Sequence, residues 1–250
     1  MSKPAVTGAI LSSSTVKTIL VHIQNDESLE HRVETALSLA RASSAHLYCL
    51  HVIPSQAYVV SDRIGGIFVM ADIMNALEAD EARIRQGMEA KLREEDVSWE
   101  YHQLAGDVTS VIISSAALAD LVVVGREPHN SGFSGSNTSL FGDLLHRSRT
   151  PFIIPSDERT SIDPTGMALI AWDGSYEAAN AVRMSVGLLK MAAGVQLVRV
   201  EEAKDEKFPS TRVLEYLSRQ GVHAELVLEE APASNSSPEA ITACLLSRAH

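Results

Sequence analysis

The sequence predicts an α/β protein with two open parallel-sheet units in tandem and helices on both faces of the sheets. Short apolar runs that end in turn residues alternate with segments whose apolar residues recur at helical spacing. This alternation starts again near residue 166, which indicates an internal duplication. A length of 250 residues suits two units, because a domain usually contains about 100–200 residues. Strands that alternate with crossover helices run parallel.

The first unit is predicted to contain five strands and four helices. Its opening apolar run, residues 18–23, ends at Gln24, Asn25 and Asp26, as a buried strand does when it leads into a polar turn. Four more apolar runs predict the remaining strands: residues 47–53, 99–104, 121–124 and 152–154. Apolar residues at helical spacing predict helices over residues 29–40, 70–92, 107–118 and 140–147.

Local signals fix several ends of these elements. Pro54 closes the second strand, because the residue before a proline disfavours the helical region. Gly106 and Asp107 give a turn and an N-cap for the third helix. The fourth strand stops at Gly125, and a loop rich in Gly, Ser and Asn follows.

The second unit repeats the opening of the first. Residues 167–172 form an apolar run that ends in Asp173, Gly174 and Ser175. The two further strands expected are residues 195–200 and 222–228, and the helices expected are residues 179–189, 209–219 and 238–248. Ser237 followed by Pro238 is a strong start for the last helix, since serine caps helices and proline is favoured at the first helical position.

We therefore expect one domain at residues 16–156 and a second at residues 166–250, joined by a linker of turn-forming residues. His250 corresponds to Asp120 of the first unit. On this alignment the second domain is truncated before its fourth strand, whereas the first is complete.

Composition and charge limit the class of partner. A formal net charge of −11 and the lack of a Lys/Arg cluster argue against a nucleic-acid partner. The two cysteines, Cys49 and Cys244, are too few for a disulfide framework, which favours a reducing cytoplasm. No apolar run approaches the ~20 residues that cross a bilayer, so a membrane partner is not expected.

The stretches from Gly106 to Gly125, ending in ADLVVVG, and Thr150 to Ile154, TPFII, resemble the second half of a universal stress protein domain. WDGS, Trp172 to Ser175, is similar to the end of strand one in that family. The resemblance covers roughly residues 16–156 and 166–250. It implies a Rossmann-like fold of the adenine-nucleotide α-hydrolase type, and in tandem members two units that resemble a fused dimer.

The same resemblance implies ATP as the candidate cofactor. Family members that bind ATP use an Asp at the end of strand one and a loop of the form G-x2-G-x9-G-[ST] after strand four. Gly125 matches the first glycine, Pro128 replaces the second, and Thr138-Ser139 aligns with the final pair. Proline removes a donor from such a loop, so the first unit fits the pattern poorly.

Gln24 stands where the first unit should carry the strand-one Asp, whereas the second unit keeps Asp173. The candidate cofactor-binding residues are Asp173, Gly174, Ser175, Gly125, Thr138 and Ser139. Of the two interpretations of Asp173, a ribose ligand or a turn-forming residue before a helix, the residue pattern favours the turn-forming one. A composite site between the units stays open, because glycines at 132, 135 and 142 leave the first loop flexible.

Other chemistries have less support. Residues 132–136, GFSGS, match no phosphate-loop or nucleophile pattern, because a serine stands where the last glycine of G-x-S-x-G belongs. His46, Cys49 and His51 share a strand, but its alternation separates His46 from the other two, which leaves fewer ligands than zinc requires. Asp26 and Glu27 lack the other residues of a phospho-receiver pocket.

The expected function is that of a non-catalytic, cytoplasmic universal stress protein that acts by binding, with weak or lost ATP binding. The alternative is an ATP-binding member that uses Asp173 or the loop from Gly125 to Ser139. The expected partners are a nucleotide and a second copy of the chain, as a homodimer, or a pseudo-dimer between the two domains. A missing fifth strand in the second unit would favour pairing between chains.

Overall fold

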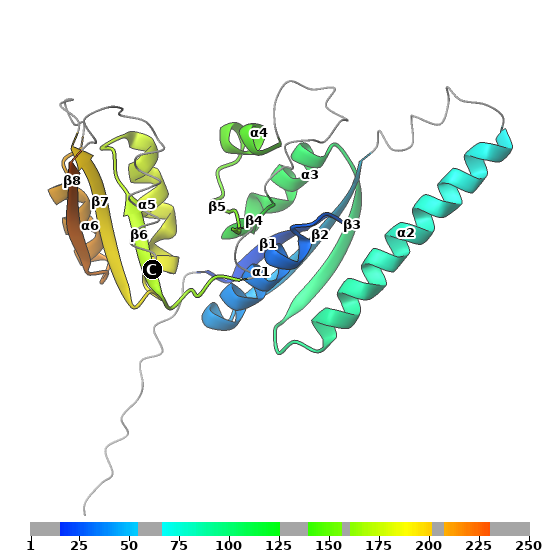
Figure 1. The fold of residues 1–250 in the computed structure, drawn as a ribbon, viewed down its shortest axis with the longest axis horizontal. Helices are drawn as coiled ribbons and strands as arrows, with labels where there is room; N and C mark the ends of the chain where they lie inside the picture. Colours follow the sequence, from blue (N-terminus) through cyan, green and yellow to red (C-terminus); the bar gives the residue numbers. More distant parts are fainter. Residues whose placement is uncertain (1–15, 55–66, 126–139, 157–160, 202–207, 231–250) are drawn as a thin grey trace, which may run out of the picture.

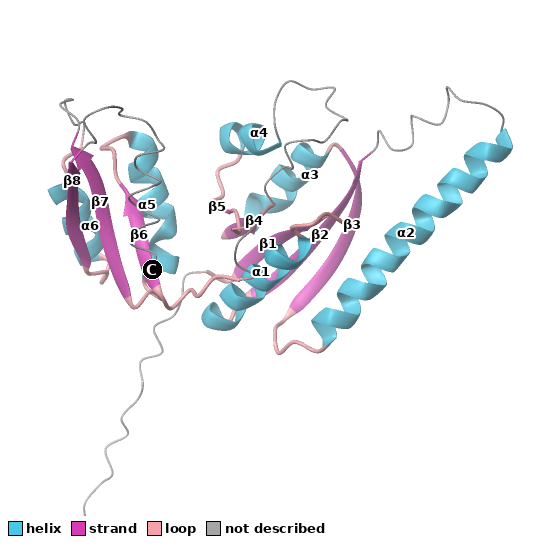
Figure 2. Cartoon of the chain, in the orientation of Figure 1, coloured by secondary structure: helices cyan, strands magenta, loops and turns pink. Residues whose placement is uncertain are grey.

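The structure, a computed structural model, describes residues 16–54, 67–125, 140–156, 161–201 and 208–230 (Figure 1). Two separate parallel sheets form the molecule, as the strands in Figure 2 show. The first has the strand order β3-β2-β1-β4-β5, and the second the order β6-β7-β8. The predicted parallel α/β class is therefore confirmed.

Residues 16–156 supply the five-stranded sheet and its helices. Its strands are β1 (Thr18–Ile23), β2 (His46–Pro54), β3 (Trp99–Gly106), β4 (Leu121–Val123) and β5 (Phe152–Ile153). Its helices are α1 (Leu29–Ser43), α2 (Ile67–Arg93), α3 (Val108–Ser115), the 3-10 turn η3 (Ala116–Leu118) and α4 (Leu140–Arg147). The predicted third helix thus ends as a 3-10 turn rather than as α-helix.

Strand β1 lies at the centre of this sheet because it pairs on both edges. Ile19 is in register with Leu47 of β2 on one side and with Leu121 of β4 on the other. The chain moves outward from β1 to β3 and then returns to β4, so the direction of strand addition reverses at β1. This reversal defines where a ligand crevice is expected in an open α/β sheet.

Helices cover both faces of the first sheet. Helices α1 and α2 bury one face, with Val33, Leu37 and Leu92 among the enclosed side chains. The opposite face is covered by Ile112 of α3 and Leu144 of α4. Successive side chains of β1 point to alternate faces of the sheet, as expected for a strand buried on both sides.

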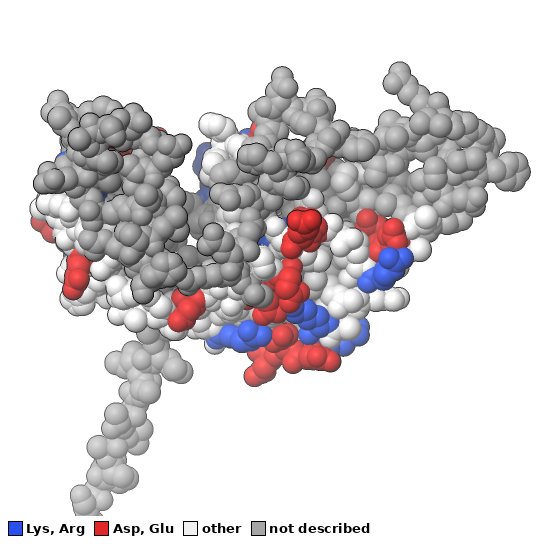
Figure 3. Space-filling view, viewed as in Figure 1, with Lys and Arg blue, Asp and Glu red and all other residues white. Residues whose placement is uncertain are grey.

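Ion pairs join the outer surfaces of α1 and α2. Lys91 of α2 lies 2.6 Å from Glu30 and 2.7 Å from Glu34 of α1. Arg41 near the end of α1 pairs with Glu95 after α2. Acidic and basic atoms accordingly lie intermingled over these helices in Figure 3. Such exposed pairs contribute little stability, at most about 1 kcal/mol each.

Residues 161–230 supply the second sheet. Its elements are β6 (Met167–Ala171), α5 (Tyr176–Leu189), β7 (Gly194–Glu201), α6 (Ser210–Arg219) and β8 (Ala224–Glu230). Strand β8 begins and ends two residues later than predicted. Helices α5 and α6 pack on the same sheet face, where Val182, Leu197 and Leu217 are buried. The helix predicted over residues 238–248 lies outside the described residues.

The two sheets meet through the linker. Ile162 of the linker and Leu188 of α5 pack against the core of the first sheet. A cavity of about 160 Å³ remains there, and Leu39, Ile153 and Met167 are among its lining residues.

Candidate functional site

The candidate site lies at the carboxyl ends of β1 and β4, where the strand order reverses. The turn from Gln24 to Ser28 joins β1 to α1 at this end, and Gly125 follows β4. The turn is shaped by Asp26, whose Oδ1 accepts a hydrogen bond from the backbone N–H of Ser28 at 3.0 Å. This short-range bond is the Asx arrangement that favours a tight turn before a helix.

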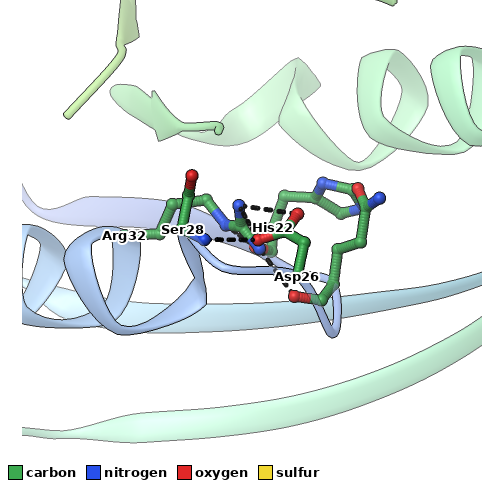
Figure 4. A network of polar contacts seen from close by, with 5 residues as sticks. His22, Asp26, Ser28 and Arg32 are labelled. Atoms are coloured by element: carbon green, nitrogen blue, oxygen red, sulfur yellow. Dashed lines mark hydrogen bonds and ion pairs between the residues drawn. The ribbon is translucent and has the colours of Figure 1, made fainter. Parts of the chain in front are cut away.

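Arg32 of α1 reaches back over the turn between β1 and α1, as Figure 4 shows. Its Nη1 donates to both carboxylate oxygens of Asp26, at 2.9 and 3.0 Å. Its Nε donates to the carbonyl oxygen of His22 at 3.0 Å, and its Nη2 donates to that of Gln24 at 2.7 Å. All three nitrogens of the guanidinium therefore bind the strand and turn that precede the helix.

The Arg32–Asp26 ion pair is largely removed from water. The Arg32 side chain is 1% exposed and that of Asp26 is 19% exposed. Taking a charge out of water is costly unless it is paired and hydrogen-bonded, so this guanidinium depends on its acceptors. Burial, followed by the nearby charges of Arg32 and His51, lowers the pKa of His22 to about 3. His22 is therefore neutral at physiological pH.

Gly125 is required by the position of Arg32. A Cβ atom at Gly125 would lie 2.2 Å from Nη1 and 3.2 Å from Cζ of Arg32. Arg32 cannot easily move away, because four hydrogen bonds hold its guanidinium. The absent side chain of Gly125 thus makes room for Arg32.

The second unit places Asp173, Gly174 and Ser175 in the turn between β6 and α5. Asp173 Oδ1 accepts from the N–H of Ser175 at 2.9 Å. Hydrogen bonding by the side chain of Ser175, and to a lesser extent by its backbone N–H, lowers the pKa of Asp173. Ser175 is the N-cap of α5, and its Oγ accepts from the N–H of Ala178 at 3.0 Å. Gly174 has a φ of 73°, which favours glycine. The three residues together form a complete helix start.

Among the described residues of this unit, two buried polar side-chain atoms have no hydrogen-bond partner. They are Nε1 of Trp172, the residue before Asp173, and Oγ of Ser210 at the start of α6. Trp172 and Ser210 are each only 5% exposed. Buried groups of this kind are usually satisfied, so each is a position where a ligand could add a hydrogen bond.

The universal stress protein family matches residues 15–154 of the chain, which is more than half of its length. The chain belongs to the universal stress protein family. No sequence match was found among curated proteins.

Solved structures agree with the fold of this universal stress protein. A universal stress protein from Archaeoglobus fulgidus superposes with a TM-score of 0.61 at 18% identity, over 86% of this chain and 77% of that one. A Pseudomonas aeruginosa protein described as a universal stress protein gives a TM-score of 0.53 at 19% identity, over 94% and 81% of the two chains. At these identities the likeness concerns the fold.

The predicted site residues of this universal stress protein fall in separate places. Gly125 lies at the crevice of the first sheet, whereas Asp173, Gly174 and Ser175 lie at the carboxyl end of the second. Thr138 and Ser139 lie outside the described residues, as do Pro128 and the glycines at 132 and 135.

Sequence reasoning missed Arg32, although a signal was present. Arg32, Ala36 and Leu39 follow one another at helical spacing on the buried face of α1. A charged residue in an apolar stripe predicts a buried partner, because isolated charges are not buried. The identity of that partner requires the tertiary structure.

On strand β2, neighbouring side chains of the protein surround Cys49 and His51. Cys49 is buried in the core, and burial, with Glu100 adding to it, raises the pKa of its thiol to about 12. His51 Nδ1 lies 2.8 Å from the hydroxyl of Tyr101, and its Nε2 lies 2.8 Å from Glu81 in a poorly aligned approach. Burial lowers the pKa of His51, and Glu81 opposes this.

Within the described ranges, no group of three or more His, Cys, Asp or Glu side chains is placed to hold a metal ion. In the same part of the chain no helix is long and apolar enough to cross a membrane.

Proposed function

We propose that this universal stress protein is non-catalytic and acts in the cytoplasm, in a stress response, through binding or contacts with other proteins. In the first unit, ATP binding is weak or lost. The observation that carries this proposal is the guanidinium of Arg32, which lies across Gly125 at the carboxyl end of β4.

Phosphate binding at a glycine loop depends on close approach of the ligand to the backbone. Arg32 occupies the space beside Gly125 that such an approach needs, and its charge is already neutralised by Asp26. The strand-one position that resembles the family's Asp is Gln24, whose carbonyl oxygen is also bound to Arg32. These contacts support a first unit without a working ATP site.

A second candidate is ATP binding at the turn that contains Asp173. Asp173 is exposed, and its lowered pKa keeps the carboxylate ionised and able to accept hydrogen bonds from a ribose. The unpartnered Trp172 Nε1 lies next to it in sequence. Under this alternative the protein remains a binding protein, with its ligand held by the second unit.

Calorimetric titration of ATP into the full chain separates the two candidates. We expect no heat of binding at micromolar protein, for the wild type and for Asp173→Ala alike. Asp163→Ala is the matched control, because Asp163 also accepts from a backbone N–H two residues later, at 2.9 Å. Micromolar affinity that Asp173→Ala abolishes and Asp163→Ala preserves would establish the second candidate instead.

The proposed partners are other proteins, among them a second copy of this chain. Strand β6 pairs with β7 and with no other described strand, whereas its counterpart β1 pairs on both sides. An unpaired edge is a template for association with another chain.

A further inference from the structure

The crevice at the end of β1 presents hydrogen-bond acceptors. Both carboxylate oxygens of Asp26 and the carbonyl oxygens of His22 and Gln24 converge on one planar group, the guanidinium of Arg32. A phosphate-binding crevice needs the opposite polarity, with N–H donors directed at the ligand. One local donor, the N–H of Ser28, is already bound to Asp26.

We propose that the switch-point crevice of the first unit is a guanidinium receptor that is filled by Arg32 of the same chain. This deepens the proposed function, because it names the kind of group that the crevice accepts as well as the reason that a nucleotide is refused. The receptor consists of Asp26, the carbonyl groups of His22 and Gln24, and the open backbone of Gly125.

The geometry selects a guanidinium over an ammonium. Three different nitrogens of Arg32 each bind a separate acceptor group, which requires the flat, fork-shaped cation of arginine. An ammonium is a compact point charge and cannot span these acceptors at once. The small space above Gly125 lets the flat group lie against the backbone.

Shortening Arg32 empties the receptor and leaves Asp26 without its cation. Arg32→Ala removes two methylene groups and the guanidinium, which together correspond to the ethylguanidinium ion. We expect ethylguanidinium to bind this variant and to raise its melting temperature by about 5 °C at saturation, since a ligand that binds only the folded state stabilises it.

Scanning calorimetry of the full chain with millimolar ethylguanidinium or ethylammonium provides the test. Ethylammonium has the same charge and ethyl group but lacks the fork, so it should leave the Arg32→Ala variant unchanged. Arg41→Ala is the control protein, because Arg41 forms an exposed ion pair with Glu95. Neither the wild type nor Arg41→Ala should respond to ethylguanidinium.

Two further variants keep the test decisive. Asp26→Asn combined with Arg32→Ala should abolish the response, because the carboxylate is the charged part of the receptor. If Arg32→Ala alone does not fold, recovery of its helical circular dichroism with ethylguanidinium, but not with ethylammonium, has the same meaning as the rise in melting temperature.

The proposal is overturned if ethylguanidinium affects Arg32→Ala no more than Arg41→Ala, or if it fails to restore an unfolded Arg32→Ala. It is also overturned if Arg32→Ala binds inorganic phosphate or ATP in its place, since an acceptor-lined crevice repels anions. ATP binding by the wild type contradicts the proposed function and leaves the ethylguanidinium result unchanged, so the two failures are distinguishable.

Discussion

At the residue scale, the close approach of Arg32 to Gly125 changes how the first glycine of the nucleotide-loop pattern is interpreted. Gly125 matches the first glycine of a nucleotide loop, yet in this structure its bare backbone accommodates a guanidinium. A glycine permits close approach of any group, so its presence does not specify a phosphate. The neighbouring atoms decide its role, and here they belong to Arg32.

The Gly125→Ala variant should be destabilised by about 1–3 kcal/mol, as is typical when an atom is forced into a packed site. The new methyl group would displace Nη1 of Arg32 and weaken its bonds to Asp26. Urea unfolding followed by circular dichroism measures the change.

Gly87→Ala is the matched control for that measurement. Gly87 lies in α2, and a Cβ atom there would have nothing within 4 Å. We expect this variant to be stabilised by up to about 1 kcal/mol, because alanine is the better helix former. Equal stability of the two variants would contradict the role assigned to Gly125.

At the element scale, the turn between β6 and α5 gives each residue of the Asp-Gly-Ser sequence a structural role. Asp173 fixes the turn, Gly174 supplies the positive φ and Ser175 caps the helix. The turn between β1 and α1 contains the same kind of bond, from the N–H of Ser28 to Asp26, and Arg32 of α1 holds it in addition. The two strand-to-helix connections therefore share the Asx bond and differ in the buried arginine.

The Ser175→Ala variant should lose about 1 kcal/mol of stability in the second unit, the usual cost of removing an N-cap side chain. Trp172 is buried beside this turn, so its fluorescence reports unfolding of the second unit once Trp99, the other tryptophan, is replaced by phenylalanine. Ser185→Ala is the control, since Ser185 bonds to the carbonyl of Ala181 inside α5 and caps nothing. An equal loss of stability in both variants would contradict the role of the Ser175 N-cap.

At the scale of the whole molecule, the described helices cover the two sheets differently. The first sheet is covered on both faces, whereas α5 and α6 pack on the same face of the second. Leu169 of β6 points to the other face, because its neighbours Ala168 and Ile170 pack under the helices, and it is 36% exposed. An apolar strand with an unpaired edge among the described residues is a surface that association would bury.

We therefore expect size-exclusion chromatography with light scattering to find a dimer at micromolar concentration. Leu169→Lys should shift the protein toward monomer, because a charge on that sheet face opposes its burial. Leu228→Lys is the control, since Leu228 is 52% exposed on the helix-covered side of β8. A monomeric wild-type protein would contradict the homodimer proposal.

The sequence by itself determined the parallel α/β class, the elements of the first unit and the N-cap at Asp107, because these depend on local periodicity and short-range hydrogen bonds. It also determined the family resemblance. The tertiary structure alone decided the chemistry of the crevice. Arg32, Asp26 and Gly125 come from a helix, a turn and the end of a distant strand, and only folding brings a helical arginine against that glycine.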